Sequence, residues 1–142
     1  PPLKLCGNYV NSILAKREAT QRGFGEALFV DDGGFVVECT GENVFMVKDG
    51  RVTAVEHGDA LPGITRDTVI QLTGADSRPV CIEELKAADE VFLTGTSAEI
   101  ARVEAIDERV FAGSPFGDAL SARYADIVRG RSEAARHWLT RV

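Results

Sequence analysis

The sequence predicts one domain of mixed α/β (α+β) class in which strands are more numerous than helices. Its 142 residues are about the size of one domain, and 44% hydrophobic with 27% charged residues is typical of a chain that forms a core. Short β-rich runs alternate with turns in the first half, and helical periodicity marks three other segments. We therefore expect a strand-rich body flanked by helices.

An amphipathic helix is predicted first, over residues 8–22. Val10, Ile13 and Leu14 recur at helical spacing and share one face, while charged residues lie mostly elsewhere. Gly23 follows as a residue suited to a C-terminal cap.

Four short strands are expected next, arranged as a meander. Turn sequences rich in Asp and Gly separate the β-rich runs, a pattern typical of antiparallel hairpins. The predicted strands cover residues 27–30, 35–39, 44–47 and 51–55.

The second half of the chain is expected to combine helices and strands. A helix is predicted from Ile64 or Thr65, just after Pro62-Gly63, to about Thr73, where a glycine stops it. The further predicted strands cover residues 79–82, 91–94 and 101–106. A last helix is predicted over residues 116–128, with four inward side chains, Phe116, Leu120, Tyr124 and Ile127.

Composition argues against two classes of partner. The formal net charge is −6 and there is no cluster of lysine or arginine, whereas nucleic-acid backbones are held by concentrated basic surface. No apolar run approaches the ~20 residues of a membrane span, and no signal-peptide pattern opens the chain. We expect neither a nucleic acid nor a membrane as partner.

The cysteines predict a reducing compartment. Cys6, Cys39 and Cys81 are odd in number and far apart, without the CxxC or Cys/His spacing of a metal site. We expect buried thiols, no metal and a cytoplasmic setting. The chain opens with Pro1-Pro2 and no initiator methionine, so we expect its first residue to be an internal position of a longer protein.

Two motifs carry the functional prediction. Lys4-Leu5-Cys6-Gly7-Asn8-Tyr9 comes first, and Glu38-Cys39-Thr40-Gly41-Glu42-Asn43 places its glutamate 34 positions after Lys4. Further motifs follow over residues 61–67, 88–92, 95–100 and 126–131. In this combination the chain resembles the fold type IV pyridoxal phosphate enzymes, and most closely the branched-chain amino acid aminotransferases.

The resemblance implies a fold and a domain assignment. By this resemblance the chain corresponds to the large C-terminal domain of that family, which is a strand-rich pseudo-barrel with flanking helices. Residues 1–142 are therefore expected to be a cofactor-binding domain, and the family's smaller N-terminal domain is not in this chain.

The chain departs from the family pattern at a few places. Two stretches, 74–79 and 112–117, are a few residues shorter, through either deletion or omission of residues. Cys39 stands where the family more often has glycine, and we expect it to narrow the site slightly. Glu42 and Asn43 are expected to support the turn after the glutamate rather than to act in catalysis.

The resemblance implies pyridoxal 5′-phosphate as cofactor and Lys4 as the catalytic residue. The Lys4 amine is implied to bind the cofactor covalently and to move a proton between the substrate α carbon and the cofactor. Tyr9 is implied to hydrogen-bond the 3′ oxygen of the cofactor. Glu38 is implied to keep the pyridine nitrogen protonated, and apolar residues before it predict a buried strand end, where an unpaired carboxylate is costly. Leu61 is implied to lie against the ring.

The phosphate is expected at two backbone turns. A helix N-terminus offers unpaired N–H groups and a favourable dipole, and the second predicted helix begins at Ile64 and Thr65. The resemblance assigns Thr96 to the phosphate as well. It assigns Ser97 and Gly41 to the substrate.

The implied activity is a transaminase that moves an amino group between branched-chain L-amino acids and 2-oxoglutarate, as a homodimer or higher homo-oligomer. D-amino acid or (R)-amine transaminases and aminodeoxychorismate lyases share the phosphate motifs and stay as alternatives. A truncated, non-catalytic assembly module is another. A phosphate-binding domain without amine chemistry leaves the pairing of Lys4 with Glu38 unexplained.

Overall fold

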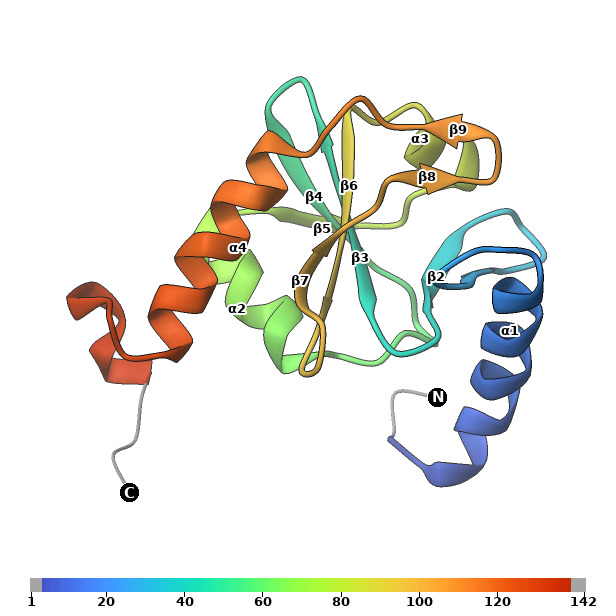
Figure 1. Cartoon of the computed structure of the whole chain (residues 1–142), viewed down its shortest axis with the longest axis horizontal. Coiled ribbons are helices and arrows are strands. Elements are labelled where there is room, and N and C mark those ends of the chain that lie inside the picture. The colour runs from blue at the N-terminus through green and yellow to red at the C-terminus, as the bar shows by residue number, and fades with distance from the viewer. Residues whose placement is uncertain (1–3, 139–142) are drawn as a thin grey trace.

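The computed structural model describes residues 4–138, which form three sheets, four α-helices and two 3₁₀ turns (Figure 1). The helical elements are η1 (Cys6–Asn8), α1 (Tyr9–Gln21), α2 (Ile64–Thr73), α3 (Ile82–Lys86), α4 (Pro115–Val128) and η2 (Glu133–Trp138). The strands are β1 (Leu28–Val30), β2 (Val36–Cys39), β3 (Asn43–Lys48), β4 (Arg51–Val55), β5 (Asp76–Arg78), β6 (Glu90–Gly95), β7 (Glu99–Arg102), β8 (Ala105–Ile106) and β9 (Arg109–Val110).

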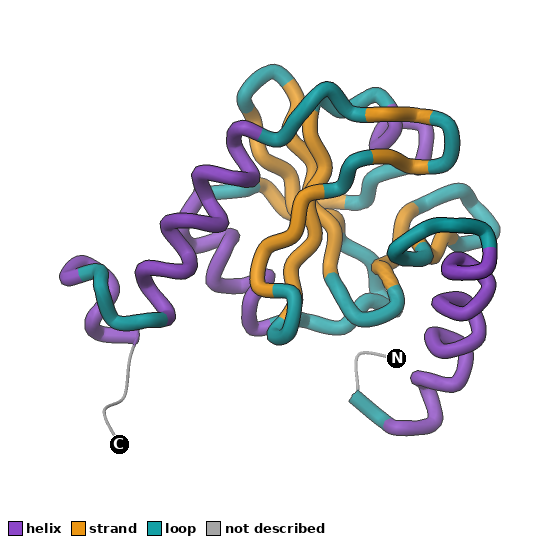
Figure 2. Tube along the Cα trace, viewed as in Figure 1, coloured by secondary structure: helices purple, strands orange, loops and turns teal. Residues whose placement is uncertain are grey.

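A five-stranded sheet in the order β5-β4-β3-β6-β7 forms the centre of the fold. Its neighbours are antiparallel except β4 and β5, which are parallel and connected through α2. The pairs β1-β2 and β8-β9 form two separate small sheets. In Figure 2 the helices α2 and α4 lie on one side of the central sheet, and the small sheets lie on the other.

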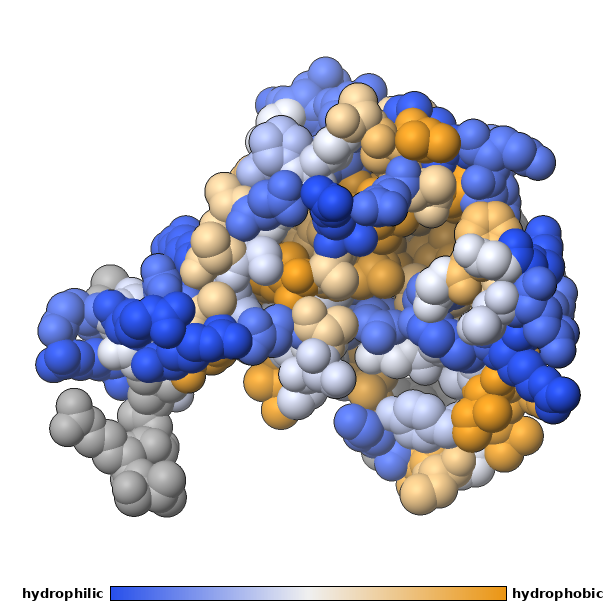
Figure 3. Space-filling model, viewed as in Figure 1, coloured by the Kyte–Doolittle hydropathy of each residue, from blue (hydrophilic) through white to orange (hydrophobic). Residues whose placement is uncertain are grey.

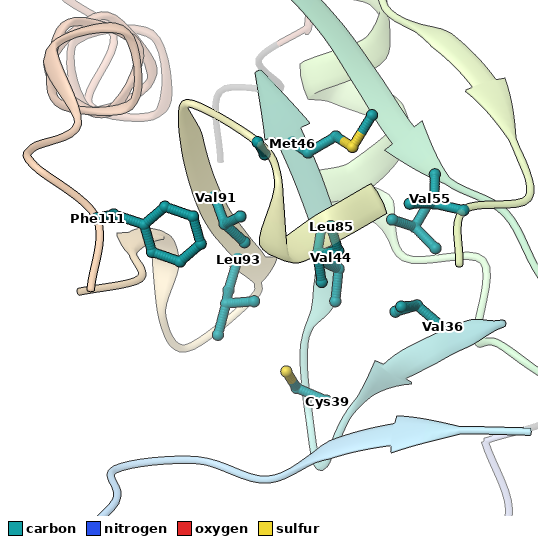
Figure 4. Packing of buried hydrophobic residues seen from close by; sticks show 11 residues of the cluster. Val36, Cys39, Val44, Met46, Val55, Leu85, Val91, Leu93 and Phe111 are labelled. Atoms are coloured by element: carbon teal, nitrogen blue, oxygen red, sulfur yellow. The ribbon is translucent and has the colours of Figure 1, made fainter. Parts of the chain in front are cut away.

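Side chains of the central strands alternate between two cores, because successive residues of a strand point to opposite faces. Val44 and Met46 of β3 face the small sheets, whereas Phe45 and Val47 face α2 and α4. Figure 4 shows the first core, where side chains from β2, β3, β4, β6 and α3 converge. This enclosure by strands and flanking helices confirms the predicted fold class.

The second core lies between the sheet and the helices α2 and α4. The rings of Phe45 and Phe92 stack with their centroids 5.0 Å apart. Val69 of α2 and Leu120 of α4 are buried against them. In α4 the inward side chains are those predicted, with Leu120 and Ile127 buried and Phe116 and Tyr124 packed against the core.

A carboxylate from the sheet caps the N-terminus of α4. The Glu90 side chain accepts hydrogen bonds from Ser114 Oγ at 3.0 Å and from the N–H groups of Phe116 and Gly117 at 3.1 Å. Glu90 is 8% exposed. A negative charge there satisfies the unpaired amides of the first turn and favours the helix dipole.

Helix α1 lies within the predicted range and is one residue shorter at each end, but its apolar face is exposed. Val10, Ile13 and Leu14 are 59%, 65% and 60% exposed, and Ala19 is the buried residue of the helix. Figure 3 shows apolar surface over the part of α1 nearer its N-terminus. The amphipathic pattern therefore does not reflect burial within the described residues.

Several predicted strands are corrected by the structure. The strand predicted at 79–82 is wrong: β5 precedes it and α3 begins at Ile82, while Val80 is fully buried in the intervening segment. The strand predicted at 101–106 is divided into β7 and β8, because the chain leaves the central sheet after Arg102 to pair β8 with β9. The predicted meander is instead two hairpins in different sheets, β1-β2 and β3-β4, because a turn closed by the Cys39 N–H and the Glu42 carbonyl redirects the chain.

The cysteines are free, and their burial differs. Cys39 is buried, Cys81 is partly buried and Cys6 is exposed, which corrects the expectation that all three are buried. Within residues 4–138, no helix has the length and apolar character needed to cross a membrane.

Candidate functional site

A cavity of about 570 Å³ lies where four connections meet. These are the segment leading into α1, the β2-β3 turn, the loop before α2 and the β6-β7 turn. The structure brings all the residues proposed from the sequence to this cavity. They are Lys4, Tyr9, Glu38, Gly41, Leu61, Ile64, Thr65, Thr96 and Ser97.

The N-terminus of α2 contributes unpaired amides to the cavity. Gly63 is the N-cap residue, and no side chain caps it. Thr65 is buried, whereas Ile64 is 83% exposed. The first N–H groups of a helix have no partner within the helix, so they and the dipole favour an anion.

Leu61 connects the loop before α2 to β2 and β3. Its N–H donates to Glu38 Oε2 at 2.8 Å, and its carbonyl accepts from Asn43 Nδ2 at 2.7 Å. Asn43 is 6% exposed, so this bond is shielded from water. A Cβ added at Gly63 would lie 2.2 Å from Asn43 Oδ1, which shows how closely the loop approaches β3.

Glu38 projects into the cavity from β2. Burial raises the pKa of this carboxyl, against the lowering effect of the Leu61 N–H. A cationic ring nitrogen beside the carboxylate would reverse this shift, because an opposite charge favours the ionised form. The geometry therefore suits Glu38 to a basic heteroatom of a ligand.

Cys39 points away from the cavity, which corrects the expectation that it narrows the site. Glu38 and Cys39 are neighbours on one strand and so face opposite sides. The Cys39 side chain lies in the first core, as Figure 4 shows, and is 5% exposed. Burial, then the nearby carboxylates of Glu26 and Glu42, raise the pKa of this thiol far above its ordinary range.

The turn after β6 lines the opposite wall of the cavity. Thr96 and Ser97 are exposed there. Thr94, at 1% exposure, also lines the cavity, and its Oγ1 has no hydrogen-bond partner within residues 4–138. A buried hydroxyl without a partner is costly, so Thr94 fits a wall that a polar ligand completes.

Lys4 and Tyr9 enter the cavity from the N-terminal side. Lys4 is exposed and Tyr9, the first residue of α1, is partly buried. The cavity thus combines an amine, a phenol and a carboxylate with amide-rich turns. This donor set suits a ligand that has an anionic group, a basic ring and an electrophilic carbon.

Two features of the site exceed the sequence prediction. Thr94 was not foreseen, and the signal for it was a threonine at the end of an otherwise apolar strand, next to the predicted Thr96. Asn43 was expected to support the turn after Glu38, and in the structure its side chain also donates a hydrogen bond to the Leu61 carbonyl.

Known proteins share both the sequence and the fold of this chain. The family model described as amino-transferase class IV matches residues 2–106. The probable branched-chain-amino-acid aminotransferase of Aquifex aeolicus is 41% identical over 149 residues, which cover 98% of this chain and 48% of that protein.

Solved structures agree with this similarity. The T.th. branched-chain amino acid aminotransferase complexed with N-(5′-phosphopyridoxyl)-L-glutamate is 42% identical with a TM-score of 0.94, and the match covers 98% of this chain and 50% of that one. The branched-chain amino acid aminotransferase of Thermobaculum terrenum in its PLP-form has a TM-score of 0.90 at 39% identity, over 99% of this chain and 49% of that one. The chain spans about half the length of the relatives it matches.

Proposed function

The chain belongs to the amino-transferase class IV family, and from this premise we propose that it binds pyridoxal 5′-phosphate and serves transamination between branched-chain L-amino acids and 2-oxoglutarate. The observation that carries the proposal is that all nine residues implied by the motifs line one cavity. The relatives named as branched-chain aminotransferases, at 41% and 42% identity, support the choice of substrate class.

The phosphate end of the cofactor fits the amide-rich side of the cavity. The uncapped N-terminus of α2 at Ile64 and Thr65 and the turn at Thr96 would hold the phosphate oxygens. The unpaired, buried Thr94 hydroxyl supports a polar occupant in this wall.

The ring end fits Glu38. Bound pyridoxal phosphate supplies a ring that accepts the electron pair of the substrate Cα–H bond, and a carboxylate at the ring nitrogen favours this role. Glu38 would hold the proton of that nitrogen, Leu61 would lie against the ring, and Tyr9 would donate to its 3′ oxygen.

Lys4 would perform the proton transfer. Its amine would hold the cofactor covalently and, once the substrate amine has displaced it, take and return the proton at the substrate α carbon. Gly41 and Ser97 would bind the substrate carboxylate end, with Ser97 donating its backbone N–H.

We extend the proposal to the organisation of the protein. Residues 1–142 are proposed as the C-terminal cofactor-binding domain, which works in a homodimer or higher homo-oligomer. The match to about half of each relative supports the domain assignment. The three free cysteines support a cytoplasmic setting.

Two alternatives follow from specific observations. The cavity walls described here carry the phosphate motifs that D-amino acid and (R)-amine transaminases and aminodeoxychorismate lyases share. The exposed apolar face of α1 favours, as a second candidate, a truncated form that assembles without turnover.

The test is borohydride trapping with pyridoxal phosphate followed by peptide mass spectrometry. We expect the reduced cofactor on the peptide that contains Lys4, no label in Lys4→Ala, and full labelling in the control Lys86→Ala, which changes a lysine paired with Asp107. Labelling at a lysine other than Lys4 would show the assignment to be wrong.

Substrate choice is tested by adding single amino acids to the loaded protein. L-leucine and L-valine are expected to convert the bound cofactor to its amine form, as followed by absorbance. Conversion by D-alanine alone would refute the branched-chain L-amino acid assignment. Label on Lys4 without conversion by any amino acid would support the non-catalytic form.

A further inference from the structure

Helix α1 makes little apolar contact with the body of the protein, although it follows Lys4 and begins with Tyr9. Ala19 is the buried residue of this helix. A recess of about 340 Å³, lined by Ala15 and Ala19 on one side and by apolar strand residues on the other, lies beneath it and opens in Figure 3 beside α1. Another interaction must therefore set the place of α1.

Lys16 supplies that interaction from the middle of α1. Its Nζ lies 2.6 Å from Glu26 Oε2 and also donates to the Gly25 carbonyl. The Glu26 side chain is 19% exposed, so this pair is better shielded from water than the Arg22–Glu18 pair at the end of α1. Lys16 thereby connects the helix to the segment that leads into β1.

Glu26 also holds the turn at the cavity. Its Oε1 accepts from Thr40 Oγ1 and, at 2.9 Å, from the Ala27 N–H. The Glu42 carboxyl is close enough to the same side chain for Glu26 to add to the effect of burial and raise its pKa. Thr40 and Glu42 both line the cavity, so one carboxylate contacts α1 on one side and the cavity wall on the other.

The same turn contacts the phosphate side of the site. A Cβ added at Gly95 would lie 3.2 Å from Glu42 Cγ and 3.3 Å from the Gly41 carbonyl oxygen. The Thr40–Glu42 turn is therefore packed between the Lys16–Glu26 pair and the turn that carries Thr96.

We propose that Glu26 is a positioning residue, which through Lys16, Thr40 and Glu42 sets the place of α1, and so of Lys4 and Tyr9, relative to the cavity wall. The inference rests on the proposed function, since that placement matters only where Lys4 reaches a bound cofactor. Glu26 itself does not line the cavity.

The two carboxyls have unequal roles in this arrangement. Burial and then the neighbouring Glu26 raise the pKa of Glu42. Burial also acts to raise the pKa of Glu26, but bonds from Lys16, Thr40 and Ala27 outweigh it and lower that pKa. Glu26 is thus the carboxyl that ionises more readily beside Lys16, and Glu42 is the one that ionises less readily, because two adjacent carboxylates disfavour each other's charge.

The experiment compares Glu26→Gln, Lys16→Met and Glu42→Gln with the control Arg17→Met, which changes the exposed residue beside Lys16. Backbone hydrogen exchange of the cofactor-free protein and the affinity for pyridoxal phosphate are measured on each. We expect Glu26→Gln and Lys16→Met to speed exchange in α1 and residues 40–42 and to weaken cofactor affinity about tenfold, within the roughly 2- to 30-fold range of residues that act without touching the ligand. Glu42→Gln leaves the Lys16–Glu26 pair in place, so its loss is smaller. Lys16→Arg restores the pair and the affinity.

Three outcomes would overturn the inference. The first is unchanged hydrogen exchange and cofactor affinity in Glu26→Gln. The second is exchange in Glu26→Gln that rises as much in β3 and β6 as in α1, because this indicates general destabilisation. The third is a larger effect from Glu42→Gln than from Glu26→Gln. Failure of the proposed function is a separate result: wild-type protein without label at Lys4 would refute it, while the exchange data would still decide whether Glu26 places α1.

Discussion

Substitution of Gly63 by alanine tests how closely the loop before α2 must approach β3. The backbone of Gly63, at φ −70° and ψ 138°, suits any residue, so the methyl group itself is not strained. That methyl carbon would nevertheless lie 2.2 Å from Asn43 Oδ1 and 3.4 Å from Asn43 Cγ. Asn43 must move, and its bond to the Leu61 carbonyl is lost.

The cost follows from that lost bond. Leaving buried polar groups unpaired costs about 1–3 kcal/mol. Alanine also restricts the unfolded chain, which offsets about 0.4–1 kcal/mol. We expect a net destabilisation of about 1–2 kcal/mol, or roughly 3–7 °C in Tm for a domain near this size.

The assay is urea and thermal unfolding of Gly63→Ala beside a matched control and a double mutant. Gly58→Ala is the control, because a Cβ there meets no atom within 4 Å, and we expect it to show only the gain of about 0.4–1 kcal/mol from restriction of the unfolded chain. In the Asn43→Ala background the added methyl group should cost nothing, since its obstacle is gone. Gly63→Ala at wild-type stability, or an equal loss in the presence of Asn43→Ala, would refute the reasoning.

Three further predictions concern buried ionisable groups. Burial raises the folded-state pKa of Glu38 above its unfolded value, so wild-type stability should fall as pH rises from the ordinary carboxyl range through the folded pKa. Glu38→Gln should remove that fall and should be more stable than wild type in urea unfolding at neutral pH. A less stable variant would contradict this expectation. Glu90→Ala should cost about 3 kcal/mol in the same assay, because the start of α4 loses a charged acceptor, and a loss below about 1 kcal/mol would show that the cap matters little. Burial raises the pKa of Cys39, so a thiol reagent should label the exposed Cys6 in the native protein and Cys39 only on unfolding. Equal labelling rates of Cys6 and Cys39 in the native protein would place Cys39 nearer the surface.

Sequence patterns within a few residues predicted correctly those elements whose ends are set by the same few residues. The helix predicted to end at Thr73 does so, because Gly74 adopts φ +67° and stops it. The apolar residues near Val80 suggested a strand, but they are buried in an irregular segment, and burial alone does not distinguish the two. The pairing of β8 with β9 was not predicted, since two-residue strands carry almost no periodic signal.

The site followed the same division. Nine of its lining residues were proposed because each belongs to a motif, and the folded chain brings these nine to one cavity. The unpaired hydroxyl of Thr94 was not, because lack of a partner depends on every neighbour in space. The exposed face of α1 was also missed, since an apolar stripe does not say what covers it.

The position of Leu61 makes its backbone amide a natural reporter of the site. Its N–H, in the peptide group with Ala60, points at the Glu38 carboxylate, and its carbonyl, in the next peptide group with Pro62, accepts from the Asn43 amide, so this residue experiences both the charge at the ring end of the cavity and the seating of the loop. In a nitrogen-edited NMR spectrum, the Leu61 amide resonance should move as Glu38 titrates, and move again when a cation lies beside that carboxylate. A single cross-peak would thus follow occupancy of the cavity without any change to the sequence.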